Sequence, residues 1–261
     1  MEILRASIYT LLGTSFTFFL TTLGAATIFM IRRKQSKNMQ SICMGFAAGI
    51  MIASAIWSLL IPGLEFAEKE SKIPWLIVSS GFLLGGVIFY FVDMFLTCQY
   101  KSKEIEDNNS VIKKLFTVIT MHNIPEGMAI GLSFSMALQE GSQKALVAAI
   151  ALAIGIGVQN LPEGAAVALP IYQNTNSRKK GFLYGALSGA IEPIGGIIAV
   201  LFFGIMQKLL AGLLAFAAGA MIYVVVSELI PEMKQENEVN IGTIATLCGF
   251  VIMMVLDVTL G

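Results

Sequence analysis

Residues 122–127 read His-Asn-Ile-Pro-Glu-Gly, and residues 159–164 repeat the pattern as Gln-Asn-Leu-Pro-Glu-Gly. Both copies stand inside strongly apolar sequence. A charged side chain at the centre of a bilayer costs at least ~2.5–3.5 kcal/mol, so ionisable residues kept there usually serve a function. The repeated motif therefore predicts a polar site built from membrane-spanning segments.

The composition is that of an integral membrane protein. Of the 261 residues, 56% are hydrophobic and 13% are charged, and the mean hydropathy is +0.78. A spanning helix needs about 20 mostly apolar residues, so the sequence predicts an all-α protein with a single transmembrane domain, residues 1–261, of eight helices. The expected spans are roughly residues 8–31, 42–64, 74–97, 114–138, 145–171, 181–206, 209–230 and 241–260.

Lysine and arginine predict the orientation of these spans, because both prefer cytoplasmic loops. The loops that follow odd-numbered spans hold 12 of the 17 basic residues, and the opposite side holds five. Both termini are therefore expected outside the cytoplasm. The zero net charge hides this division, and no basic surface is left over for nucleic acid.

A second repeat relates two spans that are far apart in the chain. Residues 46–52 read Phe-Ala-Ala-Gly-Ile-Met-Ile, and residues 216–222 read Phe-Ala-Ala-Gly-Ala-Met-Ile. The match continues, with a slip of one residue, to an Ile-Pro pair in each span. The charge topology makes the two spans antiparallel, which predicts an inverted repeat of the kind found in secondary transporters. The alternative is that small residues recur because helices pack closely through them.

The spacing within the two Pro-Glu-Gly motifs places polar side chains on one helix face. Residues four apart stack along a helix, so His122 should lie over Glu126 and Gln159 over Glu163. Each proline leaves a backbone carbonyl without its amide partner and should kink the helix. Imidazole, carboxylate and amide oxygens without thiolates suit a divalent cation such as zinc, iron, manganese or cadmium. The candidate ligands in the two motifs are His122, Asn123, Glu126, Gln159, Asn160 and Glu163.

Four further acidic residues lie in predicted spans. Glu192 precedes a proline in the middle of span six, and we expect it to bind the same or an adjacent metal, or to hydrogen-bond a neighbouring helix. Asp93 and Glu228 lie toward the cytoplasmic ends of their spans, where they could line an exit path or simply reach water. Asp257 is interpreted as an interfacial residue.

With these two motifs, eight spans and external termini, the chain resembles the ZIP family of zinc and iron transporters over its whole length. Gln159 and the Ile-Glu-Pro segment at residues 191–193 resemble the GufA-like bacterial branch. The resemblance implies a 3+2+3 arrangement, in which spans one to three and six to eight are inverted copies, together with homodimers and an elevator-like or rocking motion. It also implies two adjacent metal ions, the first bound by His122, Glu126, Gln159 and Glu163, and the second by Asn123, Glu126, Asn160, Glu163 and Glu192.

The sequence thus predicts a multi-pass protein of the cell (inner) membrane that moves a divalent metal ion into the cytoplasm by alternating access. Zn²⁺ is the expected ion, with Fe²⁺, Mn²⁺ and Cd²⁺ as alternatives, because Gln159 replaces a second histidine and leaves the site rich in oxygen. No catalytic residue and no resident cofactor are expected. An intramembrane metallopeptidase is disfavoured, since its usual His-Glu-x-x-His motif needs two histidines and the chain has one. A metal-selective channel and a membrane metal sensor stay open as alternatives.

Overall fold

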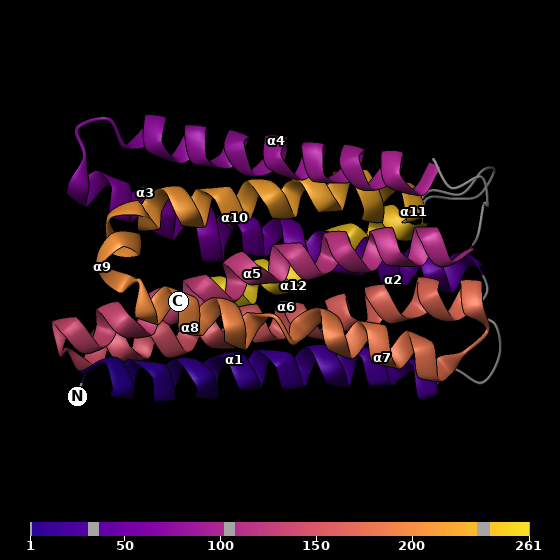
Figure 1. Cartoon of the computed structure of the whole chain (residues 1–261), viewed down its shortest axis with the longest axis horizontal. Coiled ribbons are helices and arrows are strands. Elements are labelled where there is room, and N and C mark those ends of the chain that lie inside the picture. Colours follow the sequence, from indigo (N-terminus) through magenta and orange to yellow (C-terminus); the bar gives the residue numbers. More distant parts are fainter. Residues whose placement is uncertain (1, 31–36, 102–107, 234–240, 261) are drawn as a thin grey trace.

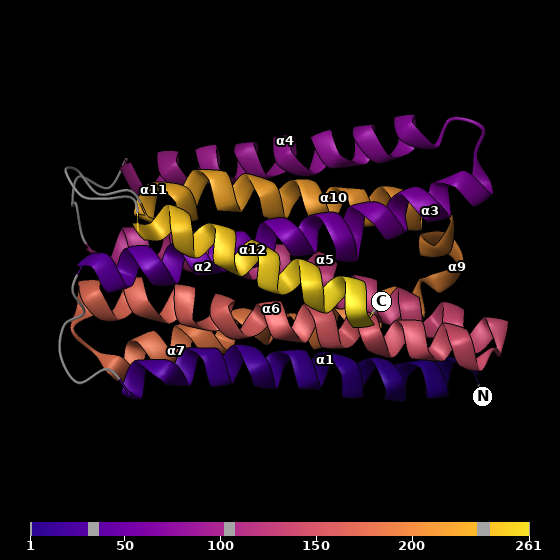
Figure 2. The ribbon, with the colours of Figure 1, turned by 180° about the vertical axis from the view of Figure 1, so that it is seen from behind.

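The computed structural model describes residues 2–30, 37–101, 108–233 and 241–260, and all regular structure within these ranges is helical. The predicted all-α class is therefore confirmed for the described part of the chain. The longer helices lie side by side, with their axes along the long direction of the molecule (Figure 1). Figure 2 shows the same bundle from behind.

The helical elements follow one another with few intervening residues. In chain order they are α1 (Glu2–Ala26), η1 (Thr27–Phe29), α2 (Lys37–Ser54), η2 (Ala55–Leu60), α3 (Ile61–Glu70), α4 (Pro74–Lys101), α5 (Asn108–Glu140), α6 (Gln143–Thr175), α7 (Arg178–Gly189), α8 (Glu192–Leu201), α9 (Phe203–Met206), η3 (Gln207–Leu209), α10 (Leu210–Val224), η4 (Val225–Leu229), α11 (Ile230–Met233) and α12 (Ile241–Leu260).

Seven helical segments within the described residues are long and apolar enough to cross a membrane. They coincide with the expected spans one to three and five to eight, so the chain is a multi-pass membrane protein. The expected fourth span falls in α5, which has 33 residues and would extend ~50 Å at ~1.5 Å per residue. It is not among the seven, because the polar motif at residues 122–127 lowers its mean hydropathy. A crossing by α5 therefore stays a prediction.

The two Phe-Ala-Ala-Gly segments pack against different helices in the same way. Gly49 in α2 lies against α12, where an added Cβ would overlap the carbonyl oxygen of Thr246. Gly219 in α10 lies against α4, where an added Cβ would overlap the carbonyl oxygen of Phe82. Each glycine thus lets its helix approach a neighbour to backbone contact, which makes α2–α12 and α4–α10 two matching, closely packed pairs.

The glycines of the two Pro-Glu-Gly motifs form a second set of matching pairs. Gly127 in α5 lies against the carbonyl oxygen of Glu192 in α8, and Gly164 in α6 lies against that of Thr21 in α1. The α5–α8 and α1–α6 pairs are accordingly among the most closely packed in the bundle. The motif therefore supplies the contact between helices as well as the polar side chains.

Each of the two repeated spans also contains a short π-helical segment, η2 before the Ile61-Pro62 pair and η4 before the Ile230-Pro231 pair. Proline has no amide hydrogen to donate, which disturbs the hydrogen bonding of the preceding turn. A π-helical turn accommodates such a disturbance and is frequent at functional sites. The segment η2 has six residues and η4 has five, which accounts for the slip of one residue between the two sequences.

The sixth expected span is interrupted in the middle of the bundle (Figure 1). The helix α7 ends at Gly189, two turn residues follow, and α8 begins at Glu192 with Pro193 in its first turn. Proline suits a first helical turn because its missing N–H would be unpaired there anyway. The interruption thus places Glu192 at a helix N-terminus, where the helix dipole favours a negative charge.

We expect replacement of Gly164 by alanine to destabilise the protein by roughly 1–3 kcal/mol, because the new methyl group would overlap the backbone of α1. Thermal unfolding of the detergent-purified protein would measure the loss. The matched control is Gly212→Ala in α10, where an added Cβ meets nothing within 4 Å. Equal melting temperatures for Gly164→Ala and Gly212→Ala would contradict the packing described here.

Candidate metal site

Six of the seven predicted ligands are buried where α5, α6 and α8 meet, and each exposes at most 1% of its surface. Glutamate, asparagine and glutamine are seldom buried so completely unless they have partners. The six are Asn123, Glu126, Gln159, Asn160, Glu163 and Glu192. His122 belongs to α5, and its side chain lies outside the described part of the structure.

Three carboxamides in this group are held through their nitrogen atoms. Gln159 Nε2 donates a hydrogen bond of 2.5 Å to Glu126 Oε1, which ties α6 to α5. Asn160 Nδ2 donates one of 2.8 Å to Glu192 Oε1, which ties α6 to α8. Asn123 Nδ2 donates to a backbone carbonyl of α7 at 3.1 Å. Because nitrogen and oxygen lie on opposite sides of an amide, these bonds also decide where each amide oxygen points.

Four oxygen atoms of the group are buried and accept no hydrogen bond from the described residues. They are Asn123 Oδ1, Glu126 Oε2, Gln159 Oε1 and Asn160 Oδ1. A buried polar atom left without a partner costs roughly 1–3 kcal/mol, so an atom of this kind often marks a place for water or an ion. All four are lone-pair acceptors. A cation is a partner that suits them all, and a site made of oxygen ligands is compatible with several divalent metals.

Three carboxylates share this interior, and the charges of Glu163 and Glu192 act on Glu126. Like charges in a low-dielectric interior repel one another unless a cation or protons compensate them. In the described part of the chain, however, no three His, Cys, Asp or Glu side chains cluster closely enough to hold a metal ion by themselves.

Thr17 in α1 also belongs to the site, although its residue type did not predict a role. Its hydroxyl donates a hydrogen bond to Glu192 Oε2, so both oxygens of that carboxylate accept from the protein. The signal in the sequence is a row of threonines three or four residues apart, which places them on one helix face. The row comprises Thr10, Thr14, Thr17 and Thr21, each fully buried.

Asp93 and Glu228 lie outside the group of buried ligands. Asp93 in α4 accepts a hydrogen bond of 3.1 Å from the Tyr223 hydroxyl in α10. Glu228 lies in η4, one of the two π-helical segments, and its charge acts on Tyr223 as well. The two predicted exit-path residues are thus close to a common phenol, and both are partly buried.

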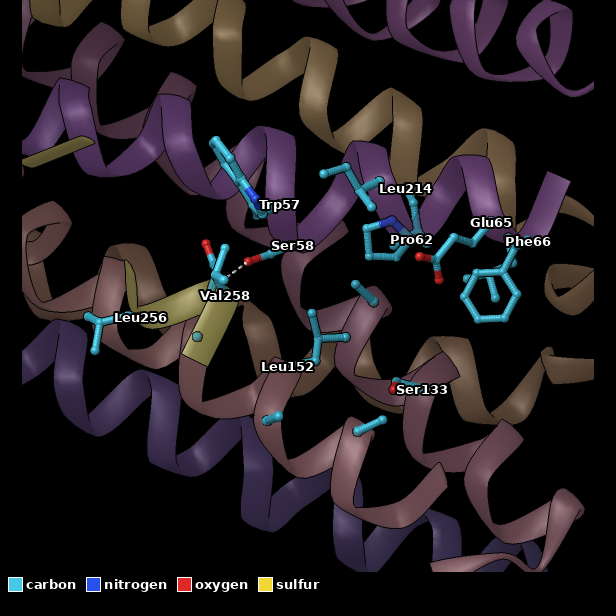
Figure 3. Close-up of a pocket in the computed structure, with 17 residues that line it drawn as sticks. Trp57, Ser58, Pro62, Glu65, Phe66, Ser133, Leu152, Leu214, Leu256 and Val258 are labelled. Atoms are coloured by element: carbon cyan, nitrogen blue, oxygen red, sulfur yellow. Dashed lines mark hydrogen bonds between the residues drawn. The ribbon is translucent and has the colours of Figure 1, made fainter. Parts of the chain in front are cut away.

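A cavity of about 410 Å³ lies between η2, α3, α5, α6, α10 and α12 (Figure 3). Its polar wall includes the Ser58 hydroxyl, which donates a hydrogen bond of 2.8 Å to Asp257 Oδ1. Asp257 therefore lines a cavity and is partly buried, whereas the sequence suggested an interfacial residue that reaches water. The cavity wall also includes Ala129 and Gly155. Each lies about one helical turn from a candidate ligand on its own helix.

A bundle of apolar helices around a buried set of acidic and amide side chains is typical of membrane transporters. A family model described as ZIP Zinc transporter matches residues 113–257. The zinc transporter GufA of Myxococcus xanthus is 32% identical, covering 92% of this chain and 94% of its own length. The zinc transporter ZupT of Escherichia coli is 30% identical, with 94% and 93% covered.

A human relative is equally similar. The zinc transporter ZIP11 of Homo sapiens is 30% identical, covering 96% of this chain and 97% of its own length. The chain therefore belongs to the ZIP zinc transporter family and is a transporter of divalent metal ions. The family that its motifs predict is confirmed.

Replacement of Gln159 by leucine should weaken the binding of Zn²⁺ about tenfold or more, because it removes one candidate ligand oxygen and the donor that orients Glu126. Isothermal titration of the detergent-purified protein with Zn²⁺ alone would measure the dissociation constant. Leu161→Ala is the control, since this side chain is on the same helix but is 38% exposed on the outside of the bundle. An unchanged dissociation constant for Gln159→Leu would exclude the glutamine from the site.

Proposed function

We propose that this protein carries Zn²⁺ into the cytoplasm by alternating access and binds the ion between α5, α6 and α8. The observation that supports this proposal most strongly is the group of four buried oxygen atoms that have no hydrogen-bond partner among the described residues, in a member of a metal transporter family. The printed names of the relatives favour zinc. Fe²⁺, Mn²⁺ and Cd²⁺ are alternative ions, because amide and carboxylate oxygens bind them as well.

The site is proposed to hold two adjacent ions. The first would be bound by His122, Glu126, Gln159 and Glu163, and the second by Asn123, Glu126, Asn160, Glu163 and Glu192. The hydrogen bond between Gln159 and Glu126 and that between Asn160 and Glu192 support this division, because each joins two ligands of one ion. Two divalent cations would also compensate the charges of the three carboxylates.

The proposed topology has eight spans with both termini outside and the basic loops in the cytoplasm. The helix α1 begins, and α12 ends, toward the same end of the bundle (Figure 1), as an even number of crossings requires. The matching pairs α2–α12 and α4–α10, and α1–α6 and α5–α8, support an inverted 3+2+3 repeat. Assembly as a homodimer and location in the cell (inner) membrane belong to the proposal as further predictions.

The cavity in Figure 3 is the proposed route of access from outside. It lies between the end of α12 and helix α3, which the charge topology places toward the extracytoplasmic side. Asp257 and Glu65 make its wall acidic, and an acidic cleft raises the local concentration of cations. Asp93 and Glu228, near the opposite end of the bundle, are the proposed exit path.

Glu126→Ala should abolish saturable Zn²⁺ uptake in reconstituted liposomes, because this carboxylate is shared by both proposed ions. Glu140→Ala is the matched control, since Glu140 is an exposed glutamate at the end of the same helix. Uptake would be followed with a zinc-sensitive dye inside the vesicles. If Glu126→Ala transported at the wild-type rate, the proposed site would be wrong.

The same vesicles distinguish the alternative functions. A carrier should show a rate that saturates with Zn²⁺ concentration, whereas a metal-selective channel should give flux that rises almost in proportion to it. A membrane metal sensor should give no flux at all. Only saturable uptake agrees with alternating access.

Asp257→Asn should raise the KM for Zn²⁺ uptake up to about tenfold at low ionic strength and leave kcat nearly unchanged, since it removes a charge from the access route but no ligand. The difference should shrink as salt screens the remaining charges. Glu68→Gln tests the specificity of the effect, because Glu68 is exposed near the same end and does not line the cavity. A shift of equal size in Glu68→Gln would point to general surface charge instead.

A further inference from the structure

The hydroxyl of Thr17 lies within hydrogen-bond reach of two acceptors. One is Glu192 Oε2 in α8, and the other is the backbone carbonyl of Thr14 in the same helix, at 3.0 Å. A threonine hydroxyl has a single hydrogen to donate. It can therefore serve either the carboxylate or the backbone carbonyl fully, but not both at once.

Glu192 differs from Glu126 in how its oxygens are used. Both oxygens of Glu192 accept hydrogen bonds, one from Asn160 and one from Thr17. Glu126 accepts only one, from Gln159, and its Oε2 has no partner among the described residues. Glu126 Oε2 is thus already open to a cation, whereas Glu192 Oε2 shares its lone pairs with the Thr17 hydroxyl and becomes a stronger ligand when Thr17 releases it.

The position of Thr17 is set by the packing of α1 rather than by the hydroxyl itself. Gly164 of α6 lies against the backbone of α1 at Thr21, and Gly196 of α8 lies against the methyl groups of Thr10 and Thr14. With α1 held on both sides of Thr17, its hydroxyl can turn between the two acceptors by rotation about one side-chain bond. No movement of a helix is needed.

We propose that Thr17 is a positioning residue that holds Glu192 while the site is empty and releases it to an arriving cation. On release, its hydroxyl donates to the carbonyl of Thr14, so the exchange leaves no buried donor unpaired. This inference rests on the proposed function, because it assumes that Glu192 is a metal ligand. It adds that the empty protein competes with the metal for this carboxylate.

The proposal predicts that one mutation in the site makes Zn²⁺ binding tighter rather than weaker. Thr17→Val keeps the shape of the side chain but removes the donor, so Glu192 Oε2 loses its partner only in the empty protein. Binding of Zn²⁺ should then become about tenfold tighter, since hydrogen bonds to charged groups are strong ones. Thr17→Ser restores the donor and should restore the wild-type dissociation constant. A residue that merely supports the fold would weaken binding or leave it unchanged when mutated.

The experiment measures the dissociation constant of Zn²⁺ by competition with a fluorescent zinc indicator, on the full-length protein purified in detergent. Thr21→Val is the matched control, since Thr21 is a fully buried threonine of the same helix whose hydroxyl donates to a backbone carbonyl. Thr17→Ala provides a second donor-free variant if Thr17→Val does not fold. Weaker or unchanged binding in the donor-free variant, or an equal shift in Thr21→Val, would overturn the proposal.

A double mutant separates this inference from the proposed function. In a Glu192→Gln background, removal of the Thr17 hydroxyl should have no further effect, because the carboxylate that it holds is absent. A tightening that persists in that background would overturn the role assigned to Thr17. Uptake that survives Glu126→Ala would instead count against the proposed site as a whole. The two failures therefore give different results.

Discussion

The structure depends on keeping three carboxylates buried between α5, α6 and α8. Removal of one such charge from water costs several kcal/mol even after relaxation. Hydrogen-bond donors stabilise these carboxylates. They are the amides of Gln159 and Asn160, the hydroxyl of Thr17 and the N-terminus of α8. These groups are dipoles and leave the net negative charge in place. A divalent cation offsets that charge. The interior that accommodates these carboxylates without an ion therefore also favours the binding of one.

Close helix packing makes this arrangement of donors possible. Amide and hydroxyl groups on short side chains reach a carboxylate on another helix only if the two backbones nearly touch. Gly127 brings α5 into backbone contact with α8, and Gly164 brings α6 into backbone contact with α1, so the four helices that carry these donors and carboxylates pack closely. One short segment of sequence therefore supplies the charge, the neighbouring donor and the contact that brings the next helix to it. This combination explains why the polar residues and the glycine recur together.

The polar group between α5, α6 and α8 was predictable as a candidate site because a glutamate inside an apolar span is costly and is kept there mainly for function. The partner of Gln159 was not, since helical spacing describes only neighbours on the same helix, whereas the amide bonds Glu126 across in α5. Thr17 was missed because a threonine in an apolar helix commonly satisfies its hydroxyl on its own backbone. The break before Glu192 was indicated only by Pro193. The expected fourth span, which falls in α5, was predicted as an apolar stretch although the polar motif interrupts it.

The cavity beside Asp257 is large enough to hold water molecules together with an ion. A volume of about 410 Å³ holds on the order of ten water molecules, each of which occupies ~30 Å³ in the liquid. A divalent ion inside it would still carry its hydration shell. On the proposed route, the shell would be removed in the helical turn between the wall at Ala129 and Gly155 and the candidate ligands beyond it. Dehydration and coordination would then take place at one point, and oxygen atoms of the protein would replace water as it leaves the ion.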